Sequence, residues 1–281
     1  MTRIIAYVAG FVNFRYTGSN MTKIVAVVNQ KGGVGKTTTA INLAAGLADQ
    51  GKFVLLVDMD PQGNASSGLG LTRDRVEHGI YEALARTHRF HDIVMNGPHD
   101  GLRIAPATSN LAGANIELVS VERREYQLAD LLTEAKHAYD YIIIDCPPSL
   151  GLLTINSLVA ADEILIPVQA EYYALEGLGQ LLETIGLIRQ HLKPNLEILG
   201  AVITMFDKRT RLSEEVMAEI YQYFPNSIFR AVIPRTVRLA EAPSFGQSIF
   251  KYEPSGKGAK AYDRLVREVL EKHQPQSAQA E

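Results

Sequence analysis

The fold is decided by one stretch of eight residues, Lys31-Gly32-Gly33-Val34-Gly35-Lys36-Thr37-Thr38. It follows an apolar run at residues 24–28 and precedes a helical pattern, which is the order of a phosphate-binding loop. Its glycines let backbone N–H groups turn toward phosphate oxygens, and Lys36 offers a positive charge to the β and γ oxygens. The Thr37 hydroxyl stands at the start of the helix, where it can ligate Mg²⁺. The stretch therefore predicts a nucleotide site.

The residues at the start of this loop depart from the common pattern. A glycine is usual at position 30, but this chain has Gln30 followed by Lys31. A single lysine beside glycines is most often a solvated loop residue, whereas the complete string between a strand and a helix favours a role at the nucleotide. Here the chain resembles the deviant-Walker group of P-loop ATPases. That resemblance implies that Lys31 reaches across a dimer interface to the partner's nucleotide.

The composition sets broad limits on function. The 281 residues are 46% hydrophobic, which is enough for a substantial core. The net charge of −3 gives no global signal for nucleic acid or membrane, but residues 207–267 hold eleven Lys/Arg against seven Asp/Glu, a local +4. The single cysteine, Cys146, excludes an internal disulfide and a Cys₄ metal site, as expected in a reducing cytoplasm.

The two ends of the chain differ from its middle. Residues 4–14 are apolar but too short to span a bilayer, and no cleavage site follows them. We expect Met21 to be the natural start and residues 1–20 to be a non-native or disordered extension; a short regulatory or partner-binding arm is the alternative. Residues 21–272 are expected to form a single P-loop ATPase domain. The polar segment 273–281 is expected to be a disordered tail.

The pattern along the chain predicts the fold class. Ala40, Leu43, Ala44 and Leu47 mark one buried face of a helix that ends near Gly51. Short apolar runs typical of buried strands lie at residues 24–28, 53–57, 141–144, 164–168, 198–203 and 228–233. Helix-length segments separate most of them. We therefore predict an α/β protein with a doubly wound, mainly parallel sheet flanked by helices, of the P-loop NTPase type.

Carboxylates follow two of the predicted strands. Asp58 and Asp60 come directly after the second run, and Asp145 ends the run at residues 141–144. Ligands bind at the carboxyl ends of the strands in such sheets, so these side chains should face the phosphates. One carboxylate can act through the Mg²⁺ shell and another can position the attacking water. The alternative for Asp60 is a turn ahead of Pro61, and strand-terminal aspartates such as Asp145 are common.

The wider set of motifs resembles the ParA/Soj family of chromosome-partitioning ATPases from about residue 21 to residue 267. The motifs are those above together with Gly63-Asn64-Ala65-Ser66-Ser67-Gly68-Leu69-Gly70, Glu171-Tyr172-Tyr173-Ala174-Leu175-Glu176-Gly177 and Pro234-Arg235-Thr236-Val237-Arg238-Leu239-Ala240-Glu241-Ala242-Pro243-Ser244-Phe245-Gly246. The resemblance implies an ATPase that dimerises with ATP and Mg²⁺. It also implies that the homodimer binds DNA non-specifically and that a ParB-type centromere-binding partner stimulates hydrolysis.

The same resemblance assigns roles residue by residue. Lys31 is the cross-interface lysine, Asp60 positions water, and these two are the catalytic candidates. Asp58 and Asp145 are metal candidates through water, together with Thr37. The nucleotide-binding candidates are Lys31, Gly32, Gly33, Val34, Gly35, Lys36, Thr37 and Thr38 in the loop, with Pro234 and Thr236 near the adenine. Many relatives have asparagine where Thr236 stands.

The basic residues near the carboxyl end are candidates for DNA contact. Lys208, Arg209 and Arg211 follow the fifth predicted strand, and Arg235 and Arg238 follow the sixth. No aromatic residues are interleaved with them, which favours phosphate contact over base recognition. A solvated charged rim is the alternative. The family resemblance favours DNA for Arg209, Arg211, Arg235 and Arg238.

Two other functions fit this sequence less well. A membrane-cycling switch like MinD requires a basic amphipathic helix at the carboxyl end, but this end has mixed charge and no aromatic anchor. A nitrogenase iron-protein relative requires two cysteines per subunit, and Cys146 alone cannot supply them. We therefore expect a cytoplasmic, nucleoid-associated protein that does not bind membranes.

Overall fold

The structure is a computed structural model that describes residues 21–171, 176–207, 209, 211–225 and 227–274. The predictions for residues 1–20, for residues 275–281 and for Lys208 lie outside this range. The eight strands in the described part are β1 (Lys23–Val27), β2 (Val54–Asp58), β3 (Met95–Asn96), β4 (Leu102–Ala105), β5 (Tyr141–Asp145), β6 (Glu163–Gln169), β7 (Glu197–Phe206) and β8 (Ile228–Pro234).

All the strands form one sheet in the order β3-β4-β2-β5-β1-β6-β7-β8. Every neighbouring pair is parallel except β3 and β4. The strand order reverses around β1, which therefore lies at the centre with β5 and β6 beside it. Such a reversal opens a crevice at the carboxyl ends of the strands, and this is the usual ligand position in doubly wound sheets. The predicted fold class is confirmed.

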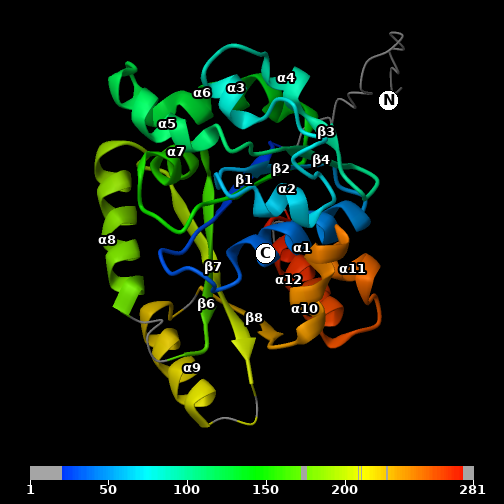
Figure 1. The fold of residues 1–281 in the computed structure, drawn as a ribbon. Helices are drawn as coiled ribbons and strands as arrows, with labels where there is room; N and C mark the ends of the chain where they lie inside the picture. The colour runs from blue at the N-terminus through cyan, green and yellow to red at the C-terminus, as the bar shows by residue number, and fades with distance from the viewer. Residues whose placement is uncertain (1–20, 172–175, 208, 210, 226, 275–281) are drawn as a thin grey trace, which may run out of the picture.

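Helices cover both faces of the sheet (Figure 1). One face carries α1 (Lys36–Asp49), α2 (Asn64–Gly68), α10 (Val237–Glu241), α11 (Ile249–Tyr252) and α12 (Lys257–Lys272). The other carries α3 (Ile80–Leu84), α4 (Phe90–Ile93), α5 (Leu111–Glu117), α6 (Gln127–Ala135), α7 (Leu152–Ala160), α8 (Glu176–His191) and α9 (Arg211–Tyr223).

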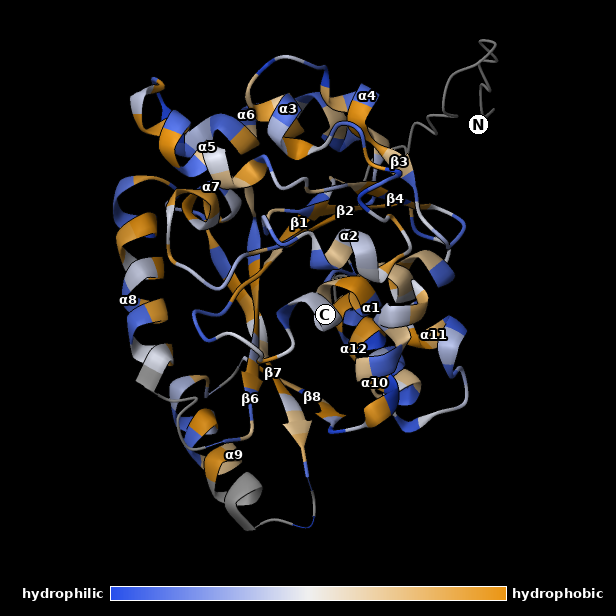
Figure 2. Ribbon diagram, in the orientation of Figure 1, coloured by the Kyte–Doolittle hydropathy of each residue, from blue (hydrophilic) through white to orange (hydrophobic). Residues whose placement is uncertain are grey.

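The two cores follow from the alternation of side chains along each strand. In β5, Ile142 and Ile144 enter the core under α3–α9, whereas Tyr141 and Ile143 enter the core under α1 and α12. Because both faces are buried, the central strands are apolar at every position rather than at alternate ones. Figure 2 shows this hydrophobic colouring on strands that lie between the two helix layers.

The apolar runs in the sequence predicted six of the eight described strands, with each predicted end within a few residues of the observed end. The P-loop helix also ends as predicted, because α1 stops at Asp49 and Gly51 adopts φ 77°. The sequence did not indicate β3 or β4. Strand β3 has two residues and β4 has four, and β4 includes Arg103. Neither is long enough to show a periodic pattern.

The sequence placed His273 in the polar tail, but the structure places it in the folded body. His273 follows the last residue of α12, and its side chain is 6% exposed. Its Nε2 lies 2.6 Å from the Glu163 carboxylate and its Nδ1 lies 3.0 Å from the Tyr141 hydroxyl. These contacts tie the end of α12 to β5 and β6. Within the described residues, no helix is long and apolar enough to cross a membrane.

Candidate active site

The residues predicted to bind the phosphates and the metal converge at the carboxyl ends of β1, β2 and β5. The P-loop leaves β1 and enters α1, Asp58 is the last residue of β2, and Asp145 is the last residue of β5. Asp58 and Asp145 are register partners on adjacent parallel strands. The topology therefore brings the loop and both carboxylates together, although nearly 90 residues separate the two aspartates in the chain.

The P-loop has the backbone conformation that its glycines permit. Gly33 and Gly35 adopt φ 76° and φ 88°, which disfavour any residue with a Cβ atom. Lys36 is 6% exposed, and its ammonium donates a hydrogen bond to the Lys31 carbonyl (2.9 Å). Burial lowers the pKa of Lys36, while the carboxylates of Asp145 and Asp60 act in the opposite direction. The lysine is thus folded back over the loop, with its charge toward the carboxylates.

Two buried polar side chains hold this loop, and neither was predicted from the sequence. Asn29 donates from Nδ2 to the Pro167 carbonyl (2.7 Å), and its Oδ1 accepts the Lys31 N–H (3.0 Å). Thr204 at the end of β7 donates to the Val34 carbonyl (2.8 Å). Asn29 and Thr204 are each 2% exposed. They connect the loop to β6 and β7, so the strand order determines where the loop lies.

Asp58 is held by a third missed residue, Ser66. The Ser66 N–H and hydroxyl both donate to Asp58 Oδ2, at 2.8 and 2.7 Å. The Asp60 N–H donates to Asp58 Oδ1 (3.2 Å). Burial nonetheless raises the pKa of Asp58 to about 6, because the group is fully enclosed and these hydrogen bonds offset only part of the desolvation. Asp60 itself is 7% exposed and accepts the Gln62 N–H (3.0 Å), as in a turn.

Asp145 is a fully buried carboxylate at the end of β5. Neither carboxylate oxygen accepts a well-formed hydrogen bond from the described residues. Desolvation raises its pKa well above the ordinary value, and the nearby charge of Asp58 adds to the shift. The Thr37 hydroxyl and Lys36 oppose the shift without overcoming it. Buried oxygens without donors, facing a threonine hydroxyl, fit a hydrated Mg²⁺ ion.

Lys31 lies at the rim of the site and contacts an acidic side chain. Its ammonium is 3.9 Å from Glu171, which follows β6, and its side chain is 31% exposed. Arg235 contacts the same carboxylate at 2.7 Å. Two predicted functional cations therefore share one counter-ion. The Lys31 contact is long and solvated, so it holds the lysine only weakly.

The other predicted DNA contacts are also paired within the chain. Arg209 makes a bidentate contact with Asp207, with a shortest distance of 2.7 Å. Arg238 contacts Glu241 at 2.9 Å and Glu253 at 3.6 Å. The side chain of Arg211 lies outside the described residues.

The predicted adenine contacts lie further along the chain. Pro234 ends β8, and the Thr236 hydroxyl accepts the Arg238 N–H (3.2 Å) as the cap of α10. Thr236 therefore has a structural task in addition to any contact with a nucleotide.

A basic groove of about 870 Å³ runs beside the edge strand β8, between α9 and α12. Its basic lining residues are Arg209, Arg230, Arg235, Lys257, Lys260 and Arg264. Arg230 and Arg264 form ion pairs with Glu268 (3.8 and 3.3 Å). Lys257 and Lys260 are exposed, and no carboxylate of the described part of the chain forms an ion pair with either. The sequence alone does not indicate a role for these two lysines, because two lysines in one helical turn are common on a solvent-exposed face.

The family comparison agrees with this geometry. The family model described as "AAA domain" matches residues 22–198. The sporulation initiation inhibitor protein Soj of Bacillus subtilis is 54% identical over 89% of this chain and 98% of that protein. The chromosome partitioning protein ParA of Myxococcus xanthus is 51% identical over 91% of this chain and 90% of that protein.

A solved structure has the same fold. The cobyrinic acid a,c-diamide synthase of Mycobacterium smegmatis, with bound ATP analog and magnesium, superposes with a TM-score of 0.81. It is 37% identical, and the match covers 90% of this chain and 96% of that one. That protein holds its ligands on the same architecture of sheet and helices.

Proposed function

The chain belongs to the ParA/Soj family of chromosome-partitioning ATPases, and we propose that it is an ATP-driven DNA-partitioning switch. In this proposal ATP and Mg²⁺ produce a sandwich homodimer that binds DNA without sequence preference. A ParB-type centromere-binding partner then stimulates hydrolysis and releases the dimer. The cycle drives the segregation of a chromosome or plasmid.

The observation that carries the proposal is the pair of buried carboxylates beside the P-loop. Asp58 and Asp145 are fully buried register partners. Asp58 accepts hydrogen bonds from Ser66 and Asp60, whereas Asp145 has only the charge of Lys36 and the Thr37 hydroxyl, among the described residues, to oppose its raised pKa. Isolated buried carboxylates are costly unless a cation or several donors compensate them. A divalent cation bound with the triphosphate supplies that compensation. Thr37 and Asp145 would hold Mg²⁺, with Asp58 in its outer shell.

The remaining residues of the site would act on the nucleotide and on water. Lys36 and the N–H groups of the loop bind the phosphates and neutralise their charge. Asp60, which is buried at 7% exposure, orients the attacking water and accepts its proton. Among the described residues, the Lys31 ammonium makes one long ion pair, with Glu171 (3.9 Å), which leaves the side chain able to move to the nucleotide of a second subunit. The Mg²⁺ ion would stabilise the charge that develops on the phosphate oxygens.

The basic groove supports the proposal of DNA binding and refines its residues. Arg209, Arg235 and Arg238 each engage a carboxylate of the chain, so a phosphate must displace that partner before binding. Lys257 and Lys260 have no such competitor among the described residues, and they begin the long helix α12. We therefore assign the first phosphate contacts to these lysines and secondary contacts to the arginines.

Phosphate release tests the ATPase proposal. The wild type should release phosphate from ATP slowly in Mg²⁺ and not at all in excess chelator. Lys36→Ala should lose nucleotide binding, because both the charge and the hydrogen bond to the loop disappear. Activity that persists in chelator, or that survives Lys36→Ala, would exclude this site.

DNA affinity measured against salt concentration tests the groove. Lys257→Glu with Lys260→Glu should flatten the dependence of log K on log salt, by about one unit for each lost phosphate contact. The control for overall charge is Lys136→Glu with Lys193→Glu, half-buried lysines at the opposite end of the sheet from the P-loop, of which Lys193 contacts Asp162 at 3.8 Å. ATP binding should remain in both variants. Equal loss in test and control would mean that overall charge, not the groove, determines binding.

A further inference from the structure

Strand β7 contains one residue whose backbone is not that of a strand. Met205, the second-last residue of β7, has φ 52°, in the left-handed region that disfavours residues with a Cβ atom. The pairing of β7 with β8 is also irregular here, because the register shifts between Ile203 and Phe206. Strain of this kind persists only where the surroundings hold it, and it is concentrated at functional sites. The neighbours of Met205 should therefore make contacts that hold this conformation.

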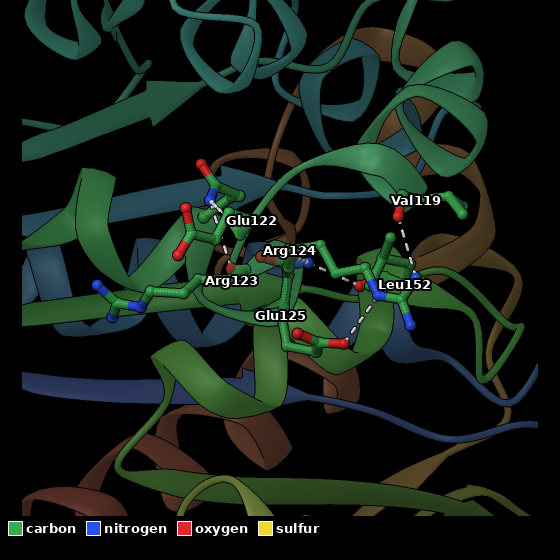
Figure 3. A network of polar contacts seen from close by, with 8 residues as sticks. Val119, Glu122, Arg123, Arg124, Glu125 and Leu152 are labelled. Carbon is green, nitrogen blue, oxygen red and sulfur yellow. Dashed lines mark hydrogen bonds and ion pairs between the residues drawn. The ribbon is translucent and has the colours of Figure 1, made fainter.

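Turns explain the other two positive φ angles of non-glycine residues in the described part of the chain. Arg86 (φ 59°) follows the end of α3 and is exposed. Arg123 (φ 52°) lies in the turn before the 3-10 helix η2 (Arg124–Tyr126), within the network of polar contacts in Figure 3. The Arg123 carbonyl accepts a hydrogen bond from Gln127 Nε2 (3.3 Å). Met205, in contrast, lies within a strand that continues on both sides of it.

The residue before Met205 contacts the P-loop. The Thr204 hydroxyl donates to the Val34 carbonyl (2.8 Å), and a Cβ atom added at Gly35 would lie 3.8 Å from Thr204 Cγ2. The Thr204 carbonyl accepts the Ala170 N–H (3.1 Å), which connects β7 to the end of β6. Any movement of Val34 and Gly35 when the loop binds phosphates therefore reaches Thr204 directly.

The residues after Met205 position two of the candidate arginines. The Phe206 carbonyl accepts the Arg235 N–H (3.1 Å), and both residues line the basic groove. The Asp207 carboxylate accepts hydrogen bonds from the Arg209 guanidinium at 2.9 and 2.7 Å, and the Arg235 guanidinium also contacts a carboxylate of the chain (2.7 Å). One residue of β7 thus separates the contact with the P-loop from the groove, in an arrangement that keeps both arginines paired.

We propose that Met205 is a positioning residue that couples the P-loop to the basic groove. Because Thr204 is fixed to the P-loop and Phe206 to the groove, rotation about the φ angle of Met205 moves one relative to the other. The left-handed backbone belongs to the arrangement in which the arginines are paired within the chain. When phosphates bind the loop and displace Thr204, Met205 relaxes to an extended backbone, and Arg235 moves away from its carboxylate toward DNA. This inference rests on the proposed function, because it names the contact through which ATP controls DNA affinity.

A series of substitutions at Met205 tests the proposal, since each changes the backbone preference in a known direction. Glycine adopts a left-handed backbone without steric cost, alanine retains the cost of a Cβ atom, and a β-branched residue raises that cost. The affinity of the full chain for a short duplex is measured in saturating ATP and in ADP. Met205→Gly should weaken DNA binding in ATP about fivefold, because the paired arrangement becomes easier to hold. Met205→Ala should remain within about twofold of wild type, and Met205→Val should raise the affinity in ADP about fivefold.

Arg86→Gly and Arg86→Ala are the matched control pair, because Arg86 also has a left-handed backbone. It follows α3, at the top of Figure 1, whereas the groove lies beside α9 and β8 at the bottom. The two Arg86 variants should bind DNA equally well in ATP. Their comparison separates the loss of strain at Met205 from a general effect of glycine on the chain.

The outcomes separate this inference from the proposed function. If wild type binds DNA more tightly in ATP but Met205→Gly and Met205→Ala bind it equally, the side chain and not the backbone of Met205 matters, and the inference is wrong. An equal loss on glycine substitution at Met205 and Arg86 would overturn it as well. If wild type binds DNA equally in ATP and in ADP, the proposed function itself is wrong, and Met205 has no coupling to carry.

Discussion

Replacement of Asp145 by asparagine should stabilise the nucleotide-free protein near neutral pH while it disables the site. The carboxyl group is fully buried and accepts no well-formed hydrogen bond from the described residues, and burial raises its pKa well above the ordinary 3.8. For a carboxyl whose pKa is raised by folding, the contribution to stability is fully present below the unfolded pKa. It is lost as pH rises through the folded pKa.

The magnitude follows from the burial of the charge. An uncompensated buried charge costs about 3 to 5 kcal/mol. Asparagine removes this cost but leaves its buried amide without a partner, a penalty of about 2 kcal/mol. The net gain should be about 2 kcal/mol near pH 7 and should be smaller near pH 5, because the cost of the carboxylate falls as the pH approaches the unfolded pKa.

Urea unfolding in chelator at these two pH values measures the effect, with Asp100→Asn as an exposed control that should change nothing. Addition of Mg²⁺ with a non-hydrolysable ATP analogue should reverse the order, because only the wild type can hold the hydrated ion. If Asp145→Asn is less stable than wild type at both pH values by the same amount, burial of the Asp145 carboxylate does not destabilise the nucleotide-free protein. Asp145 would then give no support for a cation site.

Three other substitutions test individual contacts. Lys31→Ala should retain nucleotide binding but reduce dimerisation and turnover together; a variant that hydrolyses ATP at the normal rate as a monomer contradicts the cross-interface role. Asp60→Ala should slow single-turnover hydrolysis by about 10² to 10⁴ and leave the dimer on DNA, whereas an unchanged rate assigns the water-positioning role elsewhere. Thr204→Val should weaken nucleotide affinity about fivefold, because it removes one hydrogen bond of about 1 kcal/mol to the Val34 carbonyl. Equal nucleotide affinity of the variant and wild type in calorimetry would show that the P-loop does not need this hydrogen bond.

Local patterns were sufficient for the central part of the fold. The buried strands β1, β2, β5 and β6 are apolar at nearly every position, and the P-loop string supplies its own strand and helix context. Strand β4 could not be found, because it pairs with β2 from more than 40 residues away and has only four residues. Its pairing depends on the completed sheet rather than on its own sequence.

For the candidate site, the sequence predicted the positions where residue type and spacing coincide, as in Lys36, Thr37 and Asp145, and the fold brings these residues together. The residues that support the site could not be predicted. Asn29, Ser66 and Thr204 are ordinary polar residues whose partners come from other strands. The ion pairs of the candidate arginines could not be predicted from the sequence either. Arg235, for example, pairs with Glu171, which lies 64 positions away in the chain. Charge in a sequence shows which residues can contact DNA, but only the fold shows which are already paired.

In the proposed cycle the nucleotide state controls DNA binding, which can be measured as the mass of the complex in solution. Light scattering after size exclusion gives the mass of the protein, with and without a short duplex, in ATP, in ADP and without nucleotide. We predict a dimer that co-elutes with two unrelated duplexes in ATP and a monomer free of DNA in the other conditions. Equal DNA binding in all three conditions, or an ATP-bound dimer that binds neither duplex, would contradict the account.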